Sequence, residues 1–283
     1  MVKRKSSSLD QFSLTPLPMA VDGSLAIFLK PTAEQMVLSD AVEQFFRRIQ
    51  EEYESRDRLA AHGLRPRKKI LLYGLPGNGK SMAARRLAYD LKLPILSARL
   101  DGLVDSHLGE TAKNVRKVFD QAASTPCVLL LDECDAVMRS RLDGGSGGAD
   151  PEMRRVVNSI LQIVEELDPP GVMVCTTNLV DSLDHAIFRR FDDVIEIPLP
   201  GPKERERLLE WYCPIDLDDS VSFAEVAASL EGRSADYVVK LIRDVAKDAI
   251  LGGYTAITAE MIADRLNSLA LTETALNGIL GPK

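Results

Sequence analysis

A glycine-rich run of eight residues, from Gly74 to Ser81, has the spacing of a phosphate-binding loop. Its sequence, Gly-Leu-Pro-Gly-Asn-Gly-Lys-Ser, matches the pattern G-x-x-x-x-G-K-[ST] and lies between an apolar stretch and a helical pattern. Backbone N–H groups that point into such a loop bind phosphate oxygens, together with the positive end of the helix dipole. Lys80 can reach the β- and γ-phosphates, and Ser81 can ligate Mg²⁺. The run predicts a nucleotide site lined by Pro76, Gly77, Asn78, Gly79, Lys80, Ser81 and Met82.

Two acidic residues at the end of a second apolar run provide the groups needed to hydrolyse that nucleotide. Residues 128–131 are apolar throughout, and Asp132 and Glu133 follow them. Ligands bind at the carboxyl ends of parallel strands, so we expect both carboxylates at the phosphate site. Asp132 is placed to hold Mg²⁺, directly or through water, and Glu133 to orient and polarise the attacking water. The pair predicts hydrolysis of the γ-phosphate.

The elements that must position these residues alternate along the chain. Five apolar runs have the length of buried strands, and helical spacing of apolar residues separates them: 70–73, 94–98, 128–131, 172–176 and 194–197. This alternation predicts an α/β domain over residues 31–200, with a parallel sheet sandwiched by helices. Only helical patterns follow, so residues 201–283 are expected to form a small all-helical domain. Residues 1–30 lack sustained periodicity and are expected to be a tail that is flexible or bound to a partner.

Three hydroxyl residues are predicted to cap helices. Thr32 with Gln35, and Ser222 with Glu225, have the spacing of a capping box, in which a side chain accepts a hydrogen bond from a backbone N–H three residues later. The first of these helices is expected to end near residue 63. Ser234 is the third predicted cap, at the start of an apolar helical stripe.

The charge balance and the cysteines argue against several classes of protein. The chain has 35 Lys and Arg against 42 Asp and Glu, a net charge of −7, which disfavours a broadly basic surface for nucleic acid or anionic membranes. No apolar run approaches the ~18 residues of a membrane span. No secretory signal is expected, because no apolar segment follows the basic residues near the N-terminus. The 4 cysteines show no C-x-x-C spacing and are expected to be buried, reduced thiols of a cytoplasmic protein.

With these motifs in order, the chain resembles the AAA+ ATPases, and within them the polypeptide-remodelling branch that includes katanin and spastin. The resemblance covers about residues 31–270 and rests on five segments: 74–81, 106–110, 129–135, 176–178 and 183–191. It implies an α/β nucleotide-binding domain and a helical lid. It also implies ATP and Mg²⁺ as cofactors and assembly into a ring, usually a hexamer.

The resemblance also assigns roles to individual residues. Asn178 matches the sensor residue that holds the attacking water or the γ-phosphate. Arg189 and Arg190 match the arginine fingers that reach a neighbouring subunit's γ-phosphate and neutralise charge in the transition state; the alternative is a solvated pair of arginines. His107 and Leu108 match the first pore loop, which contacts the substrate chain. Most relatives have an aromatic residue where this chain has His107, and the alternative is a loop residue without a role in binding.

Three functions are compatible with these residues. The first is a ring-shaped, Mg²⁺-dependent ATPase that remodels or unfolds a protein partner. The second is a nucleotide-gated ring that binds and regulates a separate effector without threading a chain. The third is a DNA-loading ATPase, which the net charge disfavours. The expected partners are copies of the same chain and a protein substrate or separately encoded effector, with a peptidase among the candidates, for which Leu14, Leu17 and Met19 of the tail are expected anchors.

Overall fold

The computed structural model describes five stretches of the chain, residues 25–33, 36–98, 108–135, 162–178 and 188–280. These residues divide into two compact units. The first unit contains most of the chain up to Ile197, and the second contains the chain from Pro198 onward together with Val37–Ser39 and Pro76–Asn78.

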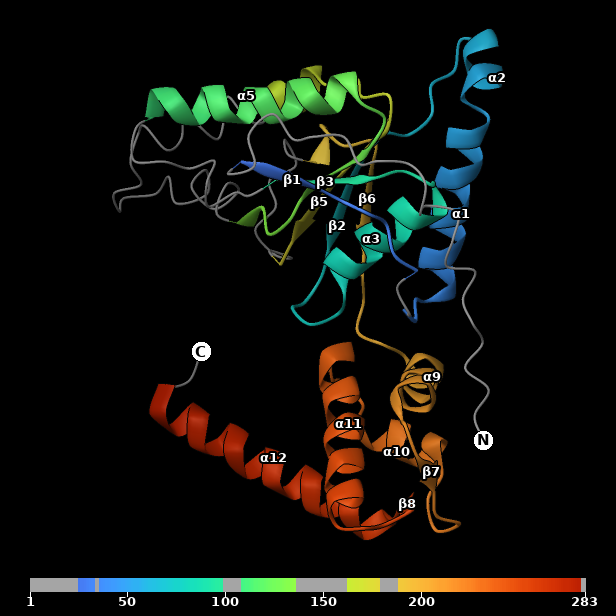
Figure 1. The fold of residues 1–283 in the computed structure, drawn as a ribbon, viewed down its shortest axis with the longest axis vertical. Coiled ribbons are helices and arrows are strands. Elements are labelled where there is room, and N and C mark those ends of the chain that lie inside the picture. The colour runs from blue at the N-terminus through green and yellow to red at the C-terminus, as the bar shows by residue number, and fades with distance from the viewer. Residues whose placement is uncertain (1–24, 34–35, 99–107, 136–161, 179–187, 281–283) are drawn as a thin grey trace. The chain divides into compact units, whose positions relative to one another are not determined.

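A six-stranded sheet forms the centre of the first unit (Figure 1). Its strands are β1 (Ala26–Leu29), β2 (Lys69–Tyr73), β3 (Ile95–Ala98), β4 (Val128–Leu131), β5 (Val172–Thr177) and β6 (Asp193–Glu196). Their order across the sheet is β1-β3-β4-β5-β2-β6, and every neighbouring pair is parallel except β1 and β3. The predicted α/β fold with a parallel sheet is confirmed. The order places β5 between β4, which precedes the acidic pair, and β2, which leads into the glycine-rich loop.

The antiparallel edge strand β1 lies in a segment for which a tail was expected. It pairs with β3 from Ala26 opposite Ala98 to Leu29 opposite Ile95. Leu25 and Ala26 are buried, with 4% and 1% of their surface exposed. The expectation of a tail as far as residue 30 is therefore wrong at its C-terminal end. A four-residue apolar run does not by itself distinguish an edge strand from a segment that binds a partner.

The central strands of the sheet are covered on both faces, because every residue of β4 and β5 is buried. Phe119 shares a core cluster with Leu129 and Met173, whereas Leu130 and Val174, the next residues along β4 and β5, are buried on the opposite face. The helices of this unit are α1 (Asp40–Glu54), α2 (Arg56–Ala61), α3 (Lys80–Asp90) and α5 (Leu108–Ser124), and residues 162–166 are also helical.

The first helix begins later than its apparent capping box predicted. α1 starts at Asp40, and residues 36–39 are not helical, so the box of Thr32 and Gln35 does not cap it. Met36 and Leu38 are buried, with 6% and 4% exposed. The early start was inferred from the spacing of Thr32 and Gln35 alone, and that spacing does not require a helix to follow.

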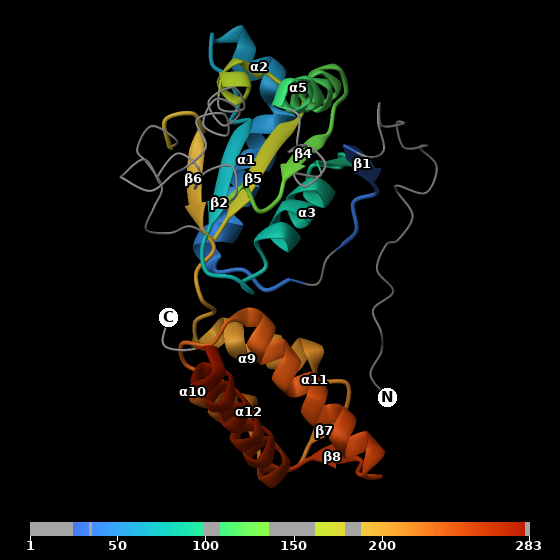
Figure 2. The same cartoon turned by 90° about the vertical axis from the view of Figure 1, so that its left-hand side faces the viewer.

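The second unit is helical, as predicted. Its helices are α9 (Pro202–Tyr212), α10 (Phe223–Ser229), α11 (Ala235–Leu251) and α12 (Ala259–Leu280). Figure 2 shows α11 and α12 packed together, and the apolar stripe of α11 lies in the core of this unit. The unit also contains a short parallel pair of strands, β7 (Asp216–Leu217) and β8 (Ala256–Ile257), which was not predicted. Strands of two residues are too short to give a recognisable pattern in a sequence. None of the described helices is long and apolar enough to cross a membrane.

Two of the predicted helix caps are confirmed in this unit. The hydroxyl of Ser222 accepts a hydrogen bond from the Glu225 backbone N–H at 3.1 Å, at the start of α10. Ser234 accepts one from the Tyr237 N–H at 3.3 Å, at the start of α11. Each bond satisfies a backbone donor that the first turn of a helix leaves without a partner.

All four cysteines are free, as their spacing predicted. Cys127, Cys134 and Cys175 are buried, and Cys213 is half-buried. Burial raises the pKa of the Cys127 thiol to about 12. A thiol with such a pKa is protonated and unreactive at neutral pH, because the thiolate is the reactive form.

Candidate nucleotide site

The glycine-rich loop connects β2 to α3 through a tight turn. Gly77 and Gly79 have φ values of 78° and 84°, in the left-handed region that glycine adopts without strain. A Cβ on Gly74 would lie 2.3 Å from the carbonyl oxygen of Ile197, so a side chain is excluded there. The glycines therefore allow the loop to turn at the carboxyl end of β2, where the motif predicted it.

Lys80, the first residue of α3, extends back along this loop. Its Nζ donates hydrogen bonds to the carbonyl oxygens of Gly74 at 2.9 Å and Leu75 at 3.0 Å. Burial lowers the pKa of Lys80, and the negative charges of the nearby acids, Asp135 first, oppose that effect. An ammonium held in this way by its own loop is a preformed partner for phosphate oxygens.

The two residues predicted to ligate Mg²⁺ are neighbours. Ser81 Oγ donates a hydrogen bond to Asp132 Oδ1 at 2.7 Å, which joins α3 to the end of β4. A hydroxyl and a carboxylate are oxygen donors of the kind that Mg²⁺ accepts, with phosphate oxygens and waters completing its six ligands. The residues present therefore fit a Mg²⁺ ion bound together with the nucleotide.

Glu133 has an unusual backbone conformation that its neighbours hold. Its φ is 54°, in the left-handed region, which costs a non-glycine residue of the order of 1–3 kcal/mol. Its N–H donates to Thr176 Oγ1 at 2.9 Å, and the next N–H, of Cys134, donates to the Thr176 carbonyl at 2.9 Å. The same threonine hydroxyl donates to Asp132 Oδ1 at 2.5 Å. Thr176 therefore contacts both members of the acidic pair. Nothing in the amino-acid sequence predicted these contacts.

Asn178 follows β5 and is bound to a third acid, Asp135. The carboxylate of Asp135 accepts three hydrogen bonds, from Thr177 Oγ1 at 2.6 Å, Asn178 N at 2.9 Å and Asn178 Nδ2 at 3.1 Å. A carboxylate only accepts, so the NH₂ end of the Asn178 amide must face Asp135. Asn178 thus follows the strand that neighbours β4, whereas Asp135 was not identified from the sequence as part of the site. Its position three residues after Asp132, shortly past the end of β4, is the signal that the sequence contains.

Arg189 and Arg190 lie at the opposite end of the sheet from the phosphate loop. They precede β6, which is parallel to β2 with Ile70 opposite Asp193. The loop follows the other end of β2, and the five residues of that strand span roughly 16 Å at about 3.3 Å per residue. Arg190 Nε is bonded to Glu165 at 3.2 Å, and Arg189 is exposed. The structure therefore does not bring these arginines to the phosphate loop of their own chain.

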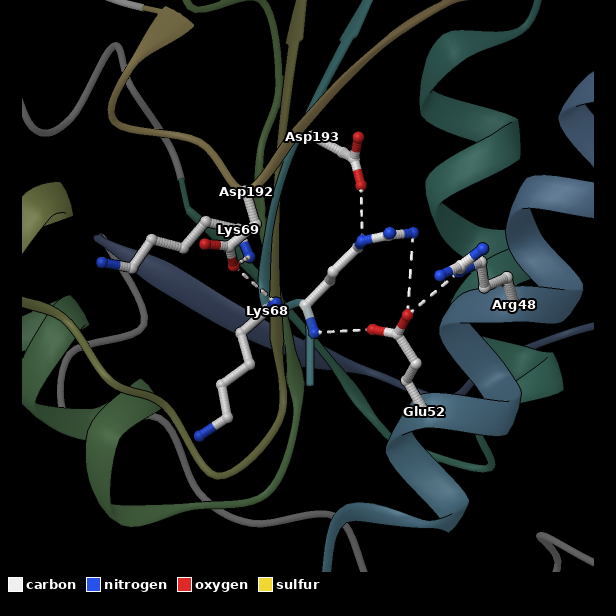
Figure 3. Close-up of polar contacts among 7 residues, drawn as sticks. Arg48, Glu52, Lys68, Lys69, Asp192 and Asp193 are labelled. Carbon is white, nitrogen blue, oxygen red and sulfur yellow. Dashed lines mark hydrogen bonds and ion pairs between the residues drawn. The ribbon is translucent and has the colours of Figure 1, made fainter. Parts of the chain in front are cut away.

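Two aspartates fix the segment that carries these arginines (Figure 3). Asp192 Oδ2 accepts hydrogen bonds from the backbone N–H groups of Lys68 at 2.8 Å and Lys69 at 2.9 Å. Asp193 forms an ion pair with Arg67 Nε at 2.8 Å. The end of the arginine segment is thus tied to the start of β2.

The remaining predicted residues divide between described and undescribed parts of the chain. Met82 lies in α3 and is half-buried. Pro76–Asn78 belong to the second unit, where Asn78 is buried and its Oδ1 accepts a hydrogen bond from Ala235 N at 3.3 Å. His107 lies outside the described residues, and Leu108 begins α5 with a side chain that is not described. The pore-loop assignment therefore stays a prediction.

Comparison with known proteins identifies a family over the part of the chain that contains these site residues. The sequence matches the family described as ATPase family associated with various cellular activities (AAA) over residues 70–199. The chain is 37% identical over 242 residues to the uncharacterized AAA family ATPase y4kL of Sinorhizobium fredii, which covers 84% of this chain and 71% of that protein.

Two further relatives are longer than this chain. A proteasome-activating nucleotidase of Methanospirillum hungatei is 33% identical over 211 residues, 72% of this chain and 51% of that protein. The ATP-dependent zinc metalloprotease FtsH 3 of Sorangium cellulosum is 33% identical over 232 residues, 80% of this chain and 38% of that protein. The similarity thus spans about half of the first protein and less of the second.

Proposed function

This chain belongs to the AAA family of ATPases and is an ATP-hydrolysing enzyme, and from that premise we propose that it works in a ring whose ATP hydrolysis remodels or unfolds a protein partner. The proposal of a ring rests on the position of Arg189 and Arg190, which lie at the end of the sheet opposite the phosphate loop. An arginine there can complete the phosphate site of a neighbouring copy but not its own.

The residues around the phosphate loop divide the work of hydrolysis. Lys80 binds the β- and γ-phosphates, while Ser81 and Asp132 hold Mg²⁺, which supplies positive charge to the phosphate oxygens. Glu133, with its exposed side chain, orients the attacking water and takes up its proton. Asn178, held by Asp135, positions the water or the γ-phosphate.

The residues assigned above to the site of a single copy include no arginine to neutralise the charge that develops in the transition state, and the arginine pair of a neighbouring copy supplies it. An arginine that neutralises the developing charge contributes about 10³–10⁵ in rate where a neighbour provides it. Arg189 is the exposed member, whereas Arg190 is bonded to Glu165 in this structure. We therefore assign the direct contact with the neighbour's γ-phosphate to Arg189, and to Arg190 a supporting role at the same interface. A ring, with a hexamer as the expected size, gives every copy such a neighbour.

The relatives support a protein as the substrate. The names of the nucleotidase and of FtsH 3 connect these proteins with a proteasome and with proteolysis. The net charge of −7 also disfavours a nucleic-acid substrate bound through a broadly basic surface. We infer that this chain likewise acts on polypeptides, alone or with a separate effector, and that His107 and Leu108 contact the substrate chain.

Mixing two inactive variants tests whether the arginine acts in a neighbouring subunit. Glu133→Gln removes the base but keeps Arg189, and Arg189→Ala removes the arginine but keeps Glu133. In a mixed ring, some sites have Glu133 in one copy and Arg189 in the next, so we expect ATPase activity to return on mixing. Arg58→Ala, at an exposed arginine of α2, is the matched control and should keep the rate of the unchanged protein.

Two results would contradict this proposal. An Arg189→Ala variant with an unchanged rate at all protein concentrations would exclude a ring in which Arg189 completes the site. A mixture as inactive as its two components would exclude action across the interface. For the substrate class, we expect unfolded casein to raise the ATPase rate, and stimulation by DNA but not by casein would favour the DNA-loading function instead.

A further inference from the structure

We propose that the hydroxyl group of Thr176 is a positioning group for hydrolysis, which holds Asp132 and Glu133 in the arrangement that the reaction needs. The proposal rests on the roles proposed above for these two acids. Thr176 itself contacts neither the phosphate nor the water in this assignment, so it acts through its two partners.

The hydroxyl has a defined direction for its proton. Thr176 is 1% exposed and lies near the end of β5, beside the end of β4. Its Oγ1 donates to Asp132 Oδ1 at 2.5 Å and accepts from Glu133 N at 2.9 Å. The carboxylate only accepts and the backbone N–H only donates, so one hydroxyl satisfies both groups in a single arrangement.

The hydrogen bond to Glu133 stabilises a conformation that this residue would otherwise avoid. A left-handed backbone at a glutamate persists only where the surrounding structure holds it. Here Glu133 has a φ of 54°, and its N–H is bound to Thr176 Oγ1. Without that acceptor, we expect the turn to sample other backbone angles, which would redirect the carboxylate of Glu133.

The hydrogen bond to Asp132 has a separate consequence for Mg²⁺ binding. Asp132 Oδ1 also accepts from Ser81 Oγ at 2.7 Å. Ser81 would ligate Mg²⁺ through an oxygen lone pair, which leaves its proton free to stay hydrogen-bonded to Asp132. Thr176 is a second donor to the same carboxylate oxygen, and it approaches from β5 rather than from α3, so the two hydroxyls together fix the direction of Asp132.

The neighbouring Thr177 shows that the two hydroxyls have different partners. Thr177 Oγ1 donates to Asp135, at 2.6 Å, and not to the Asp132–Glu133 pair. The two threonines are consecutive in β5, and their side chains are both buried. A loss of the Thr176 hydroxyl should therefore affect Asp132 and Glu133 while the contact of Asp135 with Asn178 stays in place.

The test compares Thr176→Val, which keeps the shape without the hydroxyl, with Thr176→Ser, which restores the hydroxyl. Displacing a reacting group by about 1 Å commonly lowers the rate of an enzyme about 100-fold, so we expect kcat of the Val variant to fall by about 10- to 100-fold. The KM for ATP should stay within about 2-fold, because the phosphate loop is unchanged. The Ser variant should return to within about 3-fold of the unchanged protein.

Hydrogen exchange supplies a readout that does not depend on hydrolysis. Without nucleotide or Mg²⁺, the Glu133 amide should exchange faster in the Val variant, because its acceptor is the missing hydroxyl. The Cys134 amide is the internal control, because its acceptor is the Thr176 carbonyl, which valine retains. Thr176→Ala is a second variant without the hydroxyl, in case valine fails to fold.

The outcomes separate this proposal from the proposed function. Equal losses of kcat in the Val and Ser variants would overturn the role of the hydroxyl. An unchanged hydrogen-exchange rate of the Glu133 amide in the Val variant would overturn it as well. A Glu133→Gln variant that still hydrolyses ATP would overturn the proposed role of Glu133 instead. In that case the exchange of the Glu133 amide would still decide whether Thr176 holds the turn.

Discussion

Asp135→Asn is the substitution that best tests the arrangement around Asn178, because it replaces one oxygen by an NH₂ group of nearly the same size. Asp135 Oδ1 accepts from Thr177 Oγ1 and Asn178 N, and an asparagine retains an oxygen at that position. Its Oδ2 accepts from Asn178 Nδ2 at 3.1 Å, and an asparagine would place an NH₂ group there. Two donors would then face each other in a half-buried site.

The size of the effect follows from the bond that is lost. A hydrogen bond to a charged group contributes about 1.5–3 kcal/mol to the free energy of unfolding. In a unit of this size, each kcal/mol corresponds to about 2–4 °C in Tm, so we expect Tm to fall by about 3–12 °C. Asn178 can recover part of this loss by turning its amide over, so that its oxygen faces the new NH₂ group. That turn would move the donor end of Asn178 away from its present position, and kcat would fall.

Thermal unfolding and steady-state ATPase kinetics together measure both effects. Asp219→Asn is the matched control, because Asp219 is exposed in the second unit and should change neither Tm nor kcat. A decrease in kcat with a small change in Tm would indicate that the amide has turned over. The argument about Asp135 would be wrong if its asparagine variant had the Tm and the kcat of the unchanged protein.

Two further predictions concern packing and pH. A Cβ on Gly171 would lie 1.9 Å from the backbone oxygen of Cys127, so Gly171→Ala should lower the free energy of unfolding by more than about 3 kcal/mol in urea titrations. Gly201→Ala is its control, because the Cβ there would meet only the movable carboxylate of Glu204, and an equal loss in both variants would contradict the packing argument. The pKa of Cys127 is raised from 9.0 to about 12 in the folded protein, so the unfolded chain ionises first as the pH rises. Stability should therefore decline between about pH 9 and 12, and Cys127→Ala should make that decline less steep; an unchanged slope in urea titrations from pH 8 to 10.5 would contradict it.

The sequence predicted those parts of the site that are continuous along the chain. The loop from Gly74 to Ser81 and the strand before Asp132 were recognised because strand, loop and helix follow one another in a fixed pattern. The caps at Ser222 and Ser234 depend on backbone groups three residues away, so they could be predicted as well. In each case, the partners are close in sequence.

The site residues that the sequence did not predict make their contacts across neighbouring strands. Thr176 and Asp135 gain their partners because β5 pairs with β4, and no local pattern reveals that pairing. The same is true of the bond between Arg190 and Glu165. The early start predicted for the first helix had a different cause, since the spacing of Thr32 and Gln35 resembles a capping box although α1 begins only at Asp40.

The strand order also has a consequence for synthesis on the ribosome. β2, which leads into the phosphate loop, lies between β5 and β6, and both of these strands come about a hundred residues later in the chain. Until they emerge, the apolar strand Lys69–Tyr73 has neither of its partners and presents two unpaired edges. A nascent chain that stops before Val172 would therefore be a candidate for aggregation or for binding by a chaperone, and it would have no completed site for ATP to stabilise.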